Sequence, residues 1–500
     1  MKKRITGLFE KISDFHDKHE GIIIFFILLI ILCSSTFHFK FMPFDYVWDF
    51  GNIYKLILGY HIYEEVAIII TPLFFYVGEI FLKIFGANFF VYNVLNVIME
   101  LVFYMCVFVI LKKLIKSIKF RDLILLGLVM ATIKVFGSNG PNYIPFSSIF
   151  IMLIVITTLY MKNNNWRRVL EGFLAALALL SYQKAGAVAV LIIVLYETFS
   201  DETTKKSKEF FNICISGITM ILTLGIYIVY LLITKNLYNF LDIAILGIAE
   251  FTGNFGIQNI TLVRLIAIEI VALGFLIILI KYKKINDTLR LLYFANISSI
   301  LYLYPVVNEY HNFIWLTFAF LYLVYAIDVT FDGFEFNSTK QKILMTLIYG
   351  FILVYSIVLG IIDCYKYPFY KTQYSDMFFG STLTQEQADQ IKEVNNYIKE
   401  KQEQYDKVIV FSSYAMLYEN TFINNNRFFD LPNKGNFGAK GEQGLIDEIK
   451  KMNNTLILVQ NEESEYELYQ FPNNVRNYIR ENYESIDKLQ NYDIYEINNK

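Results

Sequence analysis

The most restrictive feature of this sequence is a series of apolar runs, each long enough for a membrane helix, separated by short clusters of lysine and arginine. A helix needs about 20 consecutive apolar residues to cross the hydrocarbon core of a bilayer. Hydrophobic residues make up 55% of the chain and its mean hydropathy is +0.43, more apolar surface than a soluble protein of 500 residues can bury. The sequence therefore predicts an all-α polytopic membrane bundle.

The basic clusters predict how this bundle is oriented, because lysine and arginine concentrate in cytoplasmic loops. Placing Lys2, Lys3 and Arg4 inside puts alternate loops on the same side. Those loops are also basic, at residues 112–121, 162–168, 205–208, 281–284 and 340–342. We therefore predict a multi-pass protein of the cell membrane with a cytoplasmic N-terminus over residues 1–20. The formal net charge of -2 gives no indication of a nucleic-acid partner.

About eleven crossing helices are predicted within a membrane domain over residues 21–363. They cover residues 21–37, 89–111, 122–137, 144–161, 169–183, 185–200, 210–233, 262–280, 289–305, 312–329 and 343–363. The run that begins at Gly21 lacks a small-residue cleavage site, so it is interpreted as an uncleaved first helix. The helices on either side of Lys184 are short, which leaves two full crossings and a re-entrant or tilted hairpin as alternatives.

The first external loop, residues 38–88, is long and contains an apolar run at 68–85 that resembles a further crossing. A crossing there would move the basic loop at 112–121 to the outside. We therefore predict a helix that lies on the membrane surface, with Glu79 and Lys83 four residues apart on its polar side. A second external segment, 236–261, carries another candidate surface helix at 240–251.

The composition changes near residue 364 to asparagine, glutamate, lysine, glutamine and tyrosine, which predicts a separate domain over residues 364–500, outside the cytoplasm. Alternating helix and strand patterns there predict a small α/β sandwich. Its expected helices are 384–403, 442–452 and 473–483, and its expected strands are 407–412, 455–460 and 492–497. All four cysteines lie in or near apolar segments and none lies beyond Cys364, the first residue of this tail, so neither a disulfide framework nor a cysteine-ligated zinc site is indicated.

The first external loop also carries an ordered set of acidic, aromatic, glycine and proline residues. In chain order these are Asp45, Trp48, Asp49 and Gly51, then Gly59, Tyr60, Glu64 and Glu65, then Pro72 and Leu73, and finally Phe85 and Gly86. Further on, Tyr304, Pro305, Asn308, Glu309 and His311 precede an apolar helix, and Gln183 and Lys184 form a turn. This order resembles the GT-C superfamily of membrane glycosyltransferases, which includes the protein O-mannosyltransferases and the bacterial aminoarabinose transferase.

The resemblance covers residues 20–330 and implies transfer of a sugar from a polyprenyl-phosphate carrier to a hydroxyl acceptor at the cell surface. A hydroxyl is a weak nucleophile, so a nearby carboxylate must assist it as a general base. Asp49 is the first candidate and Asp45 the second, while Glu64 and Glu65 are expected to orient the acceptor or to hold a divalent cation. The aminoarabinose-type loop has a lysine after its second acid, whereas here Val66 follows Glu65.

The departing lipid phosphate requires cationic or hydrogen-bonding groups near the membrane boundary. The external candidates for substrate binding are Lys184, Arg264, Tyr304, Glu309 and His311. Other interpretations stay open for several of these residues. Asp45 and Asp49 could be capping or solvated acids, Arg264 could anchor a helix at the lipid headgroups, and the abundant tyrosine and phenylalanine are attributed to packing.

Two other classes of function compete with a transferase: a non-catalytic transporter or flippase for the lipid carrier, and an envelope assembly protein. A transporter should place ionisable residues along the interior of the bilayer. The candidates here lie mostly at the external ends of the helices, and Glu100 and Glu269 are the exceptions that any interpretation must explain. An assembly protein would have no need for the acids of the first loop.

Overall fold

The structure is a computed structural model, and it describes most of the chain. The described residues are 2–36, 44–137, 140–201, 206–248, 259–304, 311–331, 347, 354, 385–412, 415, 418, 434–461 and 471–499. They fall into two compact units, each built from three segments of the chain. The first unit comprises Met1–Phe39, Asn93–Leu224 and Ile257–Pro368, and the second comprises Lys40–Tyr92, Gly225–Gly256 and Phe369–Lys500.

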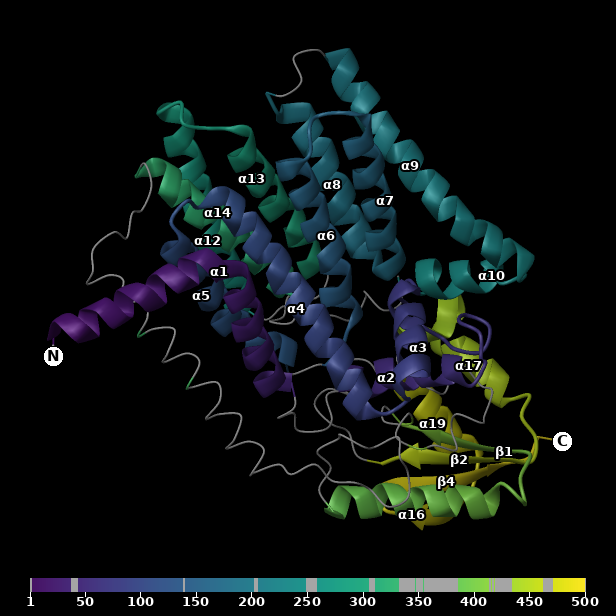
Figure 1. Cartoon of the computed structure of the whole chain (residues 1–500). Coiled ribbons are helices and arrows are strands. Elements are labelled where there is room, and N and C mark those ends of the chain that lie inside the picture. The colour runs from purple at the N-terminus through teal and green to yellow at the C-terminus, as the bar shows by residue number, and fades with distance from the viewer. Residues whose placement is uncertain are drawn as a thin grey trace. The chain divides into compact units, whose positions relative to one another are not determined.

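The first unit is a bundle of membrane helices, and every crossing segment predicted up to residue 329 is a helix in the structure. The helices are α1 (Lys2–Thr36), α4 (Phe89–Leu114), α5 (Ile118–Gly137), α6 (Tyr143–Tyr160), α7 (Asn165–Ser181), α8 (Gln183–Phe199), α9 (Lys206–Ile233), α12 (Asn259–Lys281), α13 (Asp287–Ser299) and α14 (Phe313–Thr330) (Figure 1). A short 3-10 helix, η2 (Ile300–Leu303), extends α13. The last predicted crossing, 343–363, lies outside the described residues.

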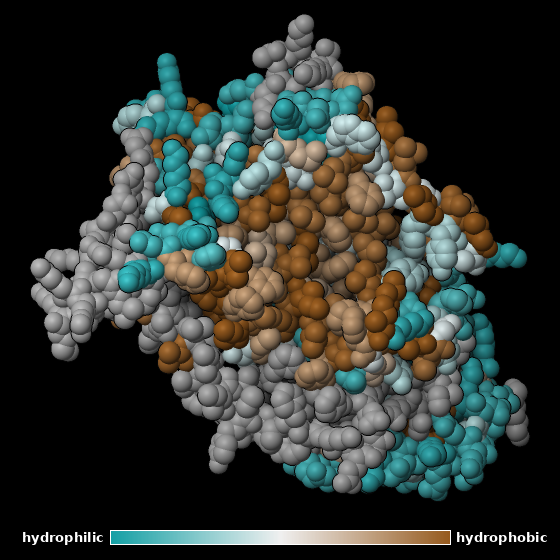
Figure 2. All heavy atoms as spheres, in the orientation of Figure 1, coloured by the Kyte–Doolittle hydropathy of each residue, from teal (hydrophilic) through white to brown (hydrophobic). Residues whose placement is uncertain are grey.

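Six helices in the described part of the chain are long and apolar enough to cross a membrane. These spans are Asp14–Thr36, Phe89–Leu114, Tyr143–Tyr160, Glu209–Ile233, Thr261–Lys281 and Phe313–Thr330. Hydrophobic side chains cover much of the visible face of the bundle (Figure 2). The polytopic all-α architecture expected from the sequence is therefore confirmed. The α7 and α8 helices have 17 residues each, so the choice between two crossings and a hairpin stays open.

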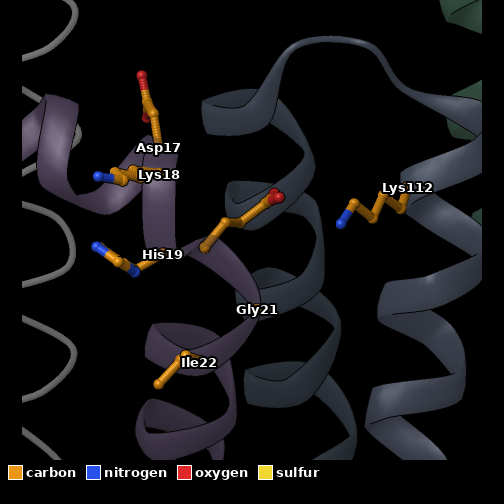
Figure 3. Close-up of a pocket in the computed structure, with 7 residues that line it drawn as sticks. Asp17, Lys18, His19, Gly21, Ile22 and Lys112 are labelled. Carbon is orange, nitrogen blue, oxygen red and sulfur yellow. The ribbon is translucent and has the colours of Figure 1, made fainter.

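The first helix differs from the prediction, because α1 already begins at Lys2 and bends at His19, where the backbone leaves helical geometry. Ion pairs with α5 hold this bend, and Glu20 accepts a hydrogen bond from Nε of Arg121 at 2.7 Å. Asp17 lies 3.7 Å from the Lys119 ammonium. The bend lines a recess of about 280 Å³ with Asp17, Lys18 and His19, across from Lys112 of α4 (Figure 3). The sequence pattern located the apolar run after Gly21 but not the helix that precedes it.

A group of four charged side chains, here called the arginine–glutamate cluster, lies buried among α7, α8 and α9. Arg168 approaches Glu197 at 2.6 Å, and Arg167 approaches both Glu171 and Glu197 at 3.2 Å. All four side chains are at most 2% exposed. Two positive and two negative charges in contact offset the cost of removing each from water. The cluster therefore ties α7 to α8, and the Asn212 side chain of α9 joins it by donating to Glu197 at 2.8 Å.

The second unit begins with two packed helices, α2 (Phe44–Ile57) and α3 (Leu73–Phe85). They approach closely at Gly78 of α3, where glycine leaves room for the side chain of Ile53 on α2. A Cβ at this position would overlap that side chain. Thirteen residues in a helix span about 20 Å, so α3 is shorter than a bilayer core. This length agrees with a surface helix, and Glu79 pairs with Lys83 at 2.6 Å as expected for its polar side. The membrane position of α3 stays a prediction.

A short helical segment after α9 joins the same unit, as α10 (Leu237–Phe240) followed by a π-helix, η1 (Leu241–Leu246). The Asn236 side chain donates to the backbone oxygen of Ile62 at 2.5 Å, and the rings of Tyr63 and Phe240 lie 5.2 Å apart. These contacts attach the segment to the turn between α2 and α3.

The C-terminal tail folds as a small α/β sandwich, as predicted. Its strands are β1 (Lys407–Phe411), β2 (Thr455–Gln460), β3 (Ser485–Leu489) and β4 (Tyr492–Ile497), in the order β1-β2-β4-β3. The β1–β2 pair is parallel and the others are antiparallel. Figure 1 shows α16 (Gln385–Lys401) on one side of the sheet, and α17 (Gly441–Ile449) and α19 (Asn473–Asn482) on the other. The β3 strand was not predicted, because it is a polar and mostly exposed edge strand.

The tail contacts the π-helix η1 through a glycine-rich turn, the 3-10 segment η6 (Lys434–Lys440). The backbone N–H of Ala439 donates to Asp242 at 3.0 Å. Gly438 has a positive φ of 69°, and a Cβ there would overlap the Asp242 carboxylate.

Candidate functional site

The α2 helix positions Asp49, the first candidate for a general base. Phe50 stacks on Phe89 at 4.1 Å and contacts Tyr92 at 5.4 Å, so aromatic packing fixes the rotation of α2 about its axis. Asp49 itself is 0% exposed. Asp45 lies one turn earlier on the same helix, but its side chain is outside the described residues. An ionised carboxylate at this position can accept the proton of a hydroxyl that comes within hydrogen-bond reach.

The turn between α2 and α3 carries Glu64 and Glu65. The backbone N–H of His61 donates to Oε2 of Glu65 at 2.8 Å, whereas Glu64 is exposed. Tyr63 closes the turn, because its hydroxyl donates to the backbone oxygen of Ile70 at 2.8 Å and its own φ is positive at 69°. Glu65 therefore supports the loop conformation, and Glu64 faces the solvent.

Lys184 and His311 come together in the first unit, from the start of α8 and from the residues just before α14. The Lys184 ammonium lies over the Tyr182 ring at 5.6 Å from its centroid. Removal of the imidazole from water, and then the positive charge of Lys184, lower the pKa of His311 to about 3. His311 is therefore neutral at physiological pH, and beside Lys184 it can serve as a hydrogen-bond donor.

Two buried tyrosines and a serine extend this pair, and the sequence analysis missed them. The rings of Tyr182 and Tyr302 lie 5.7 Å apart, and the Tyr302 hydroxyl is 3.1 Å from the hydroxyl of Ser147. Tyrosine is so abundant in this chain that composition alone could not distinguish these two from packing residues. Only their position beside Lys184 does so.

The other predicted binding residues of the first unit lie at helix ends. Arg264 is exposed near the start of α12, and Tyr304 is 72% exposed after η2. Glu309 lies outside the described residues.

Glu100 and Glu269, the two acids within the bundle, both accept hydrogen bonds from neutral side chains. Glu269 of α12 accepts from the Trp315 indole at 2.6 Å and from the Asn296 amide at 3.0 Å. Glu100 accepts from Asn96 at 3.0 Å, one turn earlier on α4. The contacts of Glu269 connect α12 with α13 and α14, which explains this acid as a tie between helices.

The chemistry of the described residues gives no clear metal site. No group of three or more histidine, cysteine, aspartate or glutamate side chains within them is arranged to hold an ion. The divalent cation considered for Glu64 and Glu65 therefore stays a prediction without structural support.

The chain thus combines a polytopic helical bundle, a buried acid on a helix of the first external loop and a small α/β tail. The family described as dolichyl-phosphate-mannose-protein mannosyltransferase matches residues 70–227. That stretch contains α3 to α8, most of α9 and Lys184, but none of the candidate acids Asp45, Asp49, Glu64 and Glu65. No curated protein matches the sequence.

Solved structures share the fold over most of the chain. ArnT from Cupriavidus metallidurans bound to undecaprenyl phosphate has a TM-score of 0.54 at 10% identity, covering 95% of this chain and 98% of that one. Its apo state has a TM-score of 0.55 at 8% identity, covering 96% and 98%. The apo oligosaccharyltransferase of Archaeoglobus fulgidus has a TM-score of 0.53 at 13% identity, covering 89% and 70%. The resemblance to the GT-C superfamily is thus confirmed, and this chain is a multi-pass membrane protein of that fold.

Proposed function

We propose that this protein is a membrane glycosyltransferase that moves a sugar from a polyprenyl-phosphate donor to a hydroxyl acceptor on the outer face of the membrane. The acceptor belongs to a cell-envelope polymer, a glycolipid or a protein. The observation that carries the proposal is the fully buried Asp49 on the first-loop helix of a chain with the GT-C fold. The similarity to ArnT bound to undecaprenyl phosphate supports the lipid carrier.

In the proposed reaction, the Asp49 carboxylate takes the proton of the acceptor hydroxyl as its oxygen attacks the anomeric carbon. The bond from that carbon to the phosphate oxygen breaks, and its electron pair stays on the lipid phosphate. A single displacement of this kind inverts the anomeric configuration. Lys184 stabilises the charge that develops on the phosphate, and neutral His311 donates a hydrogen bond to it.

The contacts of Glu100 and Glu269 support a transferase over a transporter. Both acids accept from neutral donors on their own or neighbouring helices. These contacts give each acid a structural role, so neither is needed as a step in an ion pathway.

The test is transfer of labelled sugar from polyprenyl-phosphate donors by purified protein. We expect Asp49→Asn to lower the rate by about 10² to 10⁴ while the melting temperature changes little. Lys184→Gln should raise the KM for the lipid donor, whereas the surface variant Lys83→Gln should match the wild type. Equal rates for a folded Asp49→Asn protein would remove Asp49 as the base. Failure of the wild type to transfer any sugar would favour a flippase or an assembly protein.

A further inference from the structure

The α2 helix presents a second buried surface, here called the polar face of α2, formed by Trp48, Asn52 and Lys55. Positions separated by four and then three residues lie on the same side of a helix. Their side chains are 6%, 1% and 1% exposed. Lysine is rarely buried to this extent unless it is paired. Its ammonium lies 5.9 Å from the centroid of the Tyr60 ring.

Hydrogen-bonding atoms on this face are left without partners. Both the amide nitrogen and the amide oxygen of Asn52 are buried with no hydrogen-bond partner in the described part of the chain, and so is the indole nitrogen of Trp48. A buried polar group without a partner costs about 1 to 3 kcal/mol, so such atoms point to a ligand or to ordered water. The Trp48 ring is itself held in place, because it packs edge-on against Phe75 at 6.1 Å.

The unsatisfied atoms define the chemistry of the ligand. The indole and the amide nitrogen donate hydrogen bonds, and the amide oxygen of Asn52 accepts one. A sugar hydroxyl both donates and accepts, so neighbouring hydroxyls of one sugar ring can satisfy both amide atoms. An ionised phosphate has no proton to give to the amide oxygen, and an alkyl chain satisfies neither atom.

We infer that the polar face of α2 binds the sugar unit of the lipid-linked donor. Asn52 follows Asp49 by three residues, so the sugar would be held one helical turn from the proposed base. Lys55 supplies a cation on the same face, although the chain lacks the lysine expected after Glu65. This inference rests on the proposed function, and it names the part of the donor that α2 recognises.

Binding to purified protein tests the inference with four probes: undecaprenyl phosphate alone, and the same lipid phosphate carrying mannose, glucose or N-acetylglucosamine. The wild type should bind the best of the three sugar lipids about tenfold more tightly than the bare lipid phosphate, as expected for one or two net hydrogen bonds. Asn52→Leu should remove this preference and keep the affinity for the bare lipid. Ile53→Leu, on the packed side of the same helix, should retain the preference.

Stability separates a binding role from a structural one. Leucine has the same branched shape and the same number of heavy atoms as asparagine and has no polar atoms to satisfy, so Asn52→Leu should melt near the wild-type temperature. If Asn52→Leu does not fold, Trp48→Phe replaces it, because phenylalanine keeps an aromatic ring against Phe75 and removes the N–H donor. That variant should weaken the sugar preference severalfold.

The possible outcomes differ for the two proposals. Equal wild-type affinity for all four lipids would overturn the sugar site and leave the lipid carrier standing. If Asn52→Leu keeps the wild-type preference for sugar lipids over the bare lipid phosphate, Asn52 binds only water and the inference is overturned. If the variant melts at a lower temperature and binds the bare lipid more weakly, Asn52 has a structural role and the inference is likewise overturned. Binding of none of the four lipids would overturn the proposed function and this inference together.

Discussion

The arginine–glutamate cluster and the polar face of α2 are both buried, yet they satisfy their polar atoms differently. Each of Arg167, Arg168, Glu171 and Glu197 has an ion-pair partner inside the cluster. On the polar face of α2, both amide atoms of Asn52 lack a partner among the described residues. The charges of the cluster are therefore matched within the protein, although Nε of Arg168 and Oε2 of Glu171 make no hydrogen bond among the described residues. No such pairing of opposite charges accounts for the neutral amide of Asn52, whose atoms a ligand can satisfy.

The largest effect should come from breaking the arginine–glutamate cluster. Arg167→Met leaves Glu171 and Glu197 with less compensation in a buried setting, which should lower the free energy of unfolding by about 3 to 5 kcal/mol. Thermal or denaturant unfolding in detergent measures this loss. The exposed neighbour Trp166 offers a matched control, because Trp166→Phe should unfold like the wild type. Similar stability of both variants would mean that the cluster does not hold the helices.

A smaller loss in the free energy of unfolding should follow from a substitution that pushes apart α7 and α9, which both border the arginine–glutamate cluster. A Cβ on Gly172 of α7 would overlap the backbone carbonyl of Ser216 on α9, so Gly172→Ala should cost about 1 to 3 kcal/mol. Gly217, the next residue along α9, faces open space. Gly217→Ala should therefore be neutral or slightly stabilising, and a loss as large as that of Gly172→Ala would contradict the close approach.

The effect that is smallest near neutral pH concerns His311, which would carry a positive charge beside that of Lys184 if it were protonated, whereas the cluster pairs opposite charges. Its pKa is lowered to about 3 in the folded protein, against about 6.5 for an unperturbed histidine. Between these pH values the unfolded chain binds the extra proton, so stability should fall as pH falls from about 6.5 towards 3. The contribution is fully present above about pH 6.5, and its slope is at most about 1.4 kcal/mol per pH unit.

Unfolding of the wild type and of His311→Gln across this pH range measures that slope. The variant should lose stability less steeply with acid, because glutamine does not titrate. Parallel curves for the two proteins would show that His311 titrates alike in the folded and unfolded states.

The sequence predicted the elements with strong patterns. The helices of the bundle and the buried strands β1 and β2 follow from apolar runs of the right length. The edge strand β3 and the helix before Gly21 lack such runs, so the sequence could not reveal them. Among the candidate residues, Asp49 and Lys184 were selected by motif. Asn52, Lys55 and Tyr302 were missed because their importance lies in burial and neighbours, which residue type does not show.

The second unit has a consequence for how the protein is made. Its three parts, Lys40–Tyr92, Gly225–Gly256 and Phe369–Lys500, are separated by two long stretches of the first unit. The helices α2 and α3 are therefore synthesised early, but the unit to which they belong is complete only after the tail has been made. Its η1–η6 contact at Asp242 needs residues near Ala439. During translation the bundle can assemble from local helix pairs, whereas the second unit is completed last. A ribosome stalled before residue 369 would hold a chain with the bundle helices present and the Asp49-bearing unit unfinished.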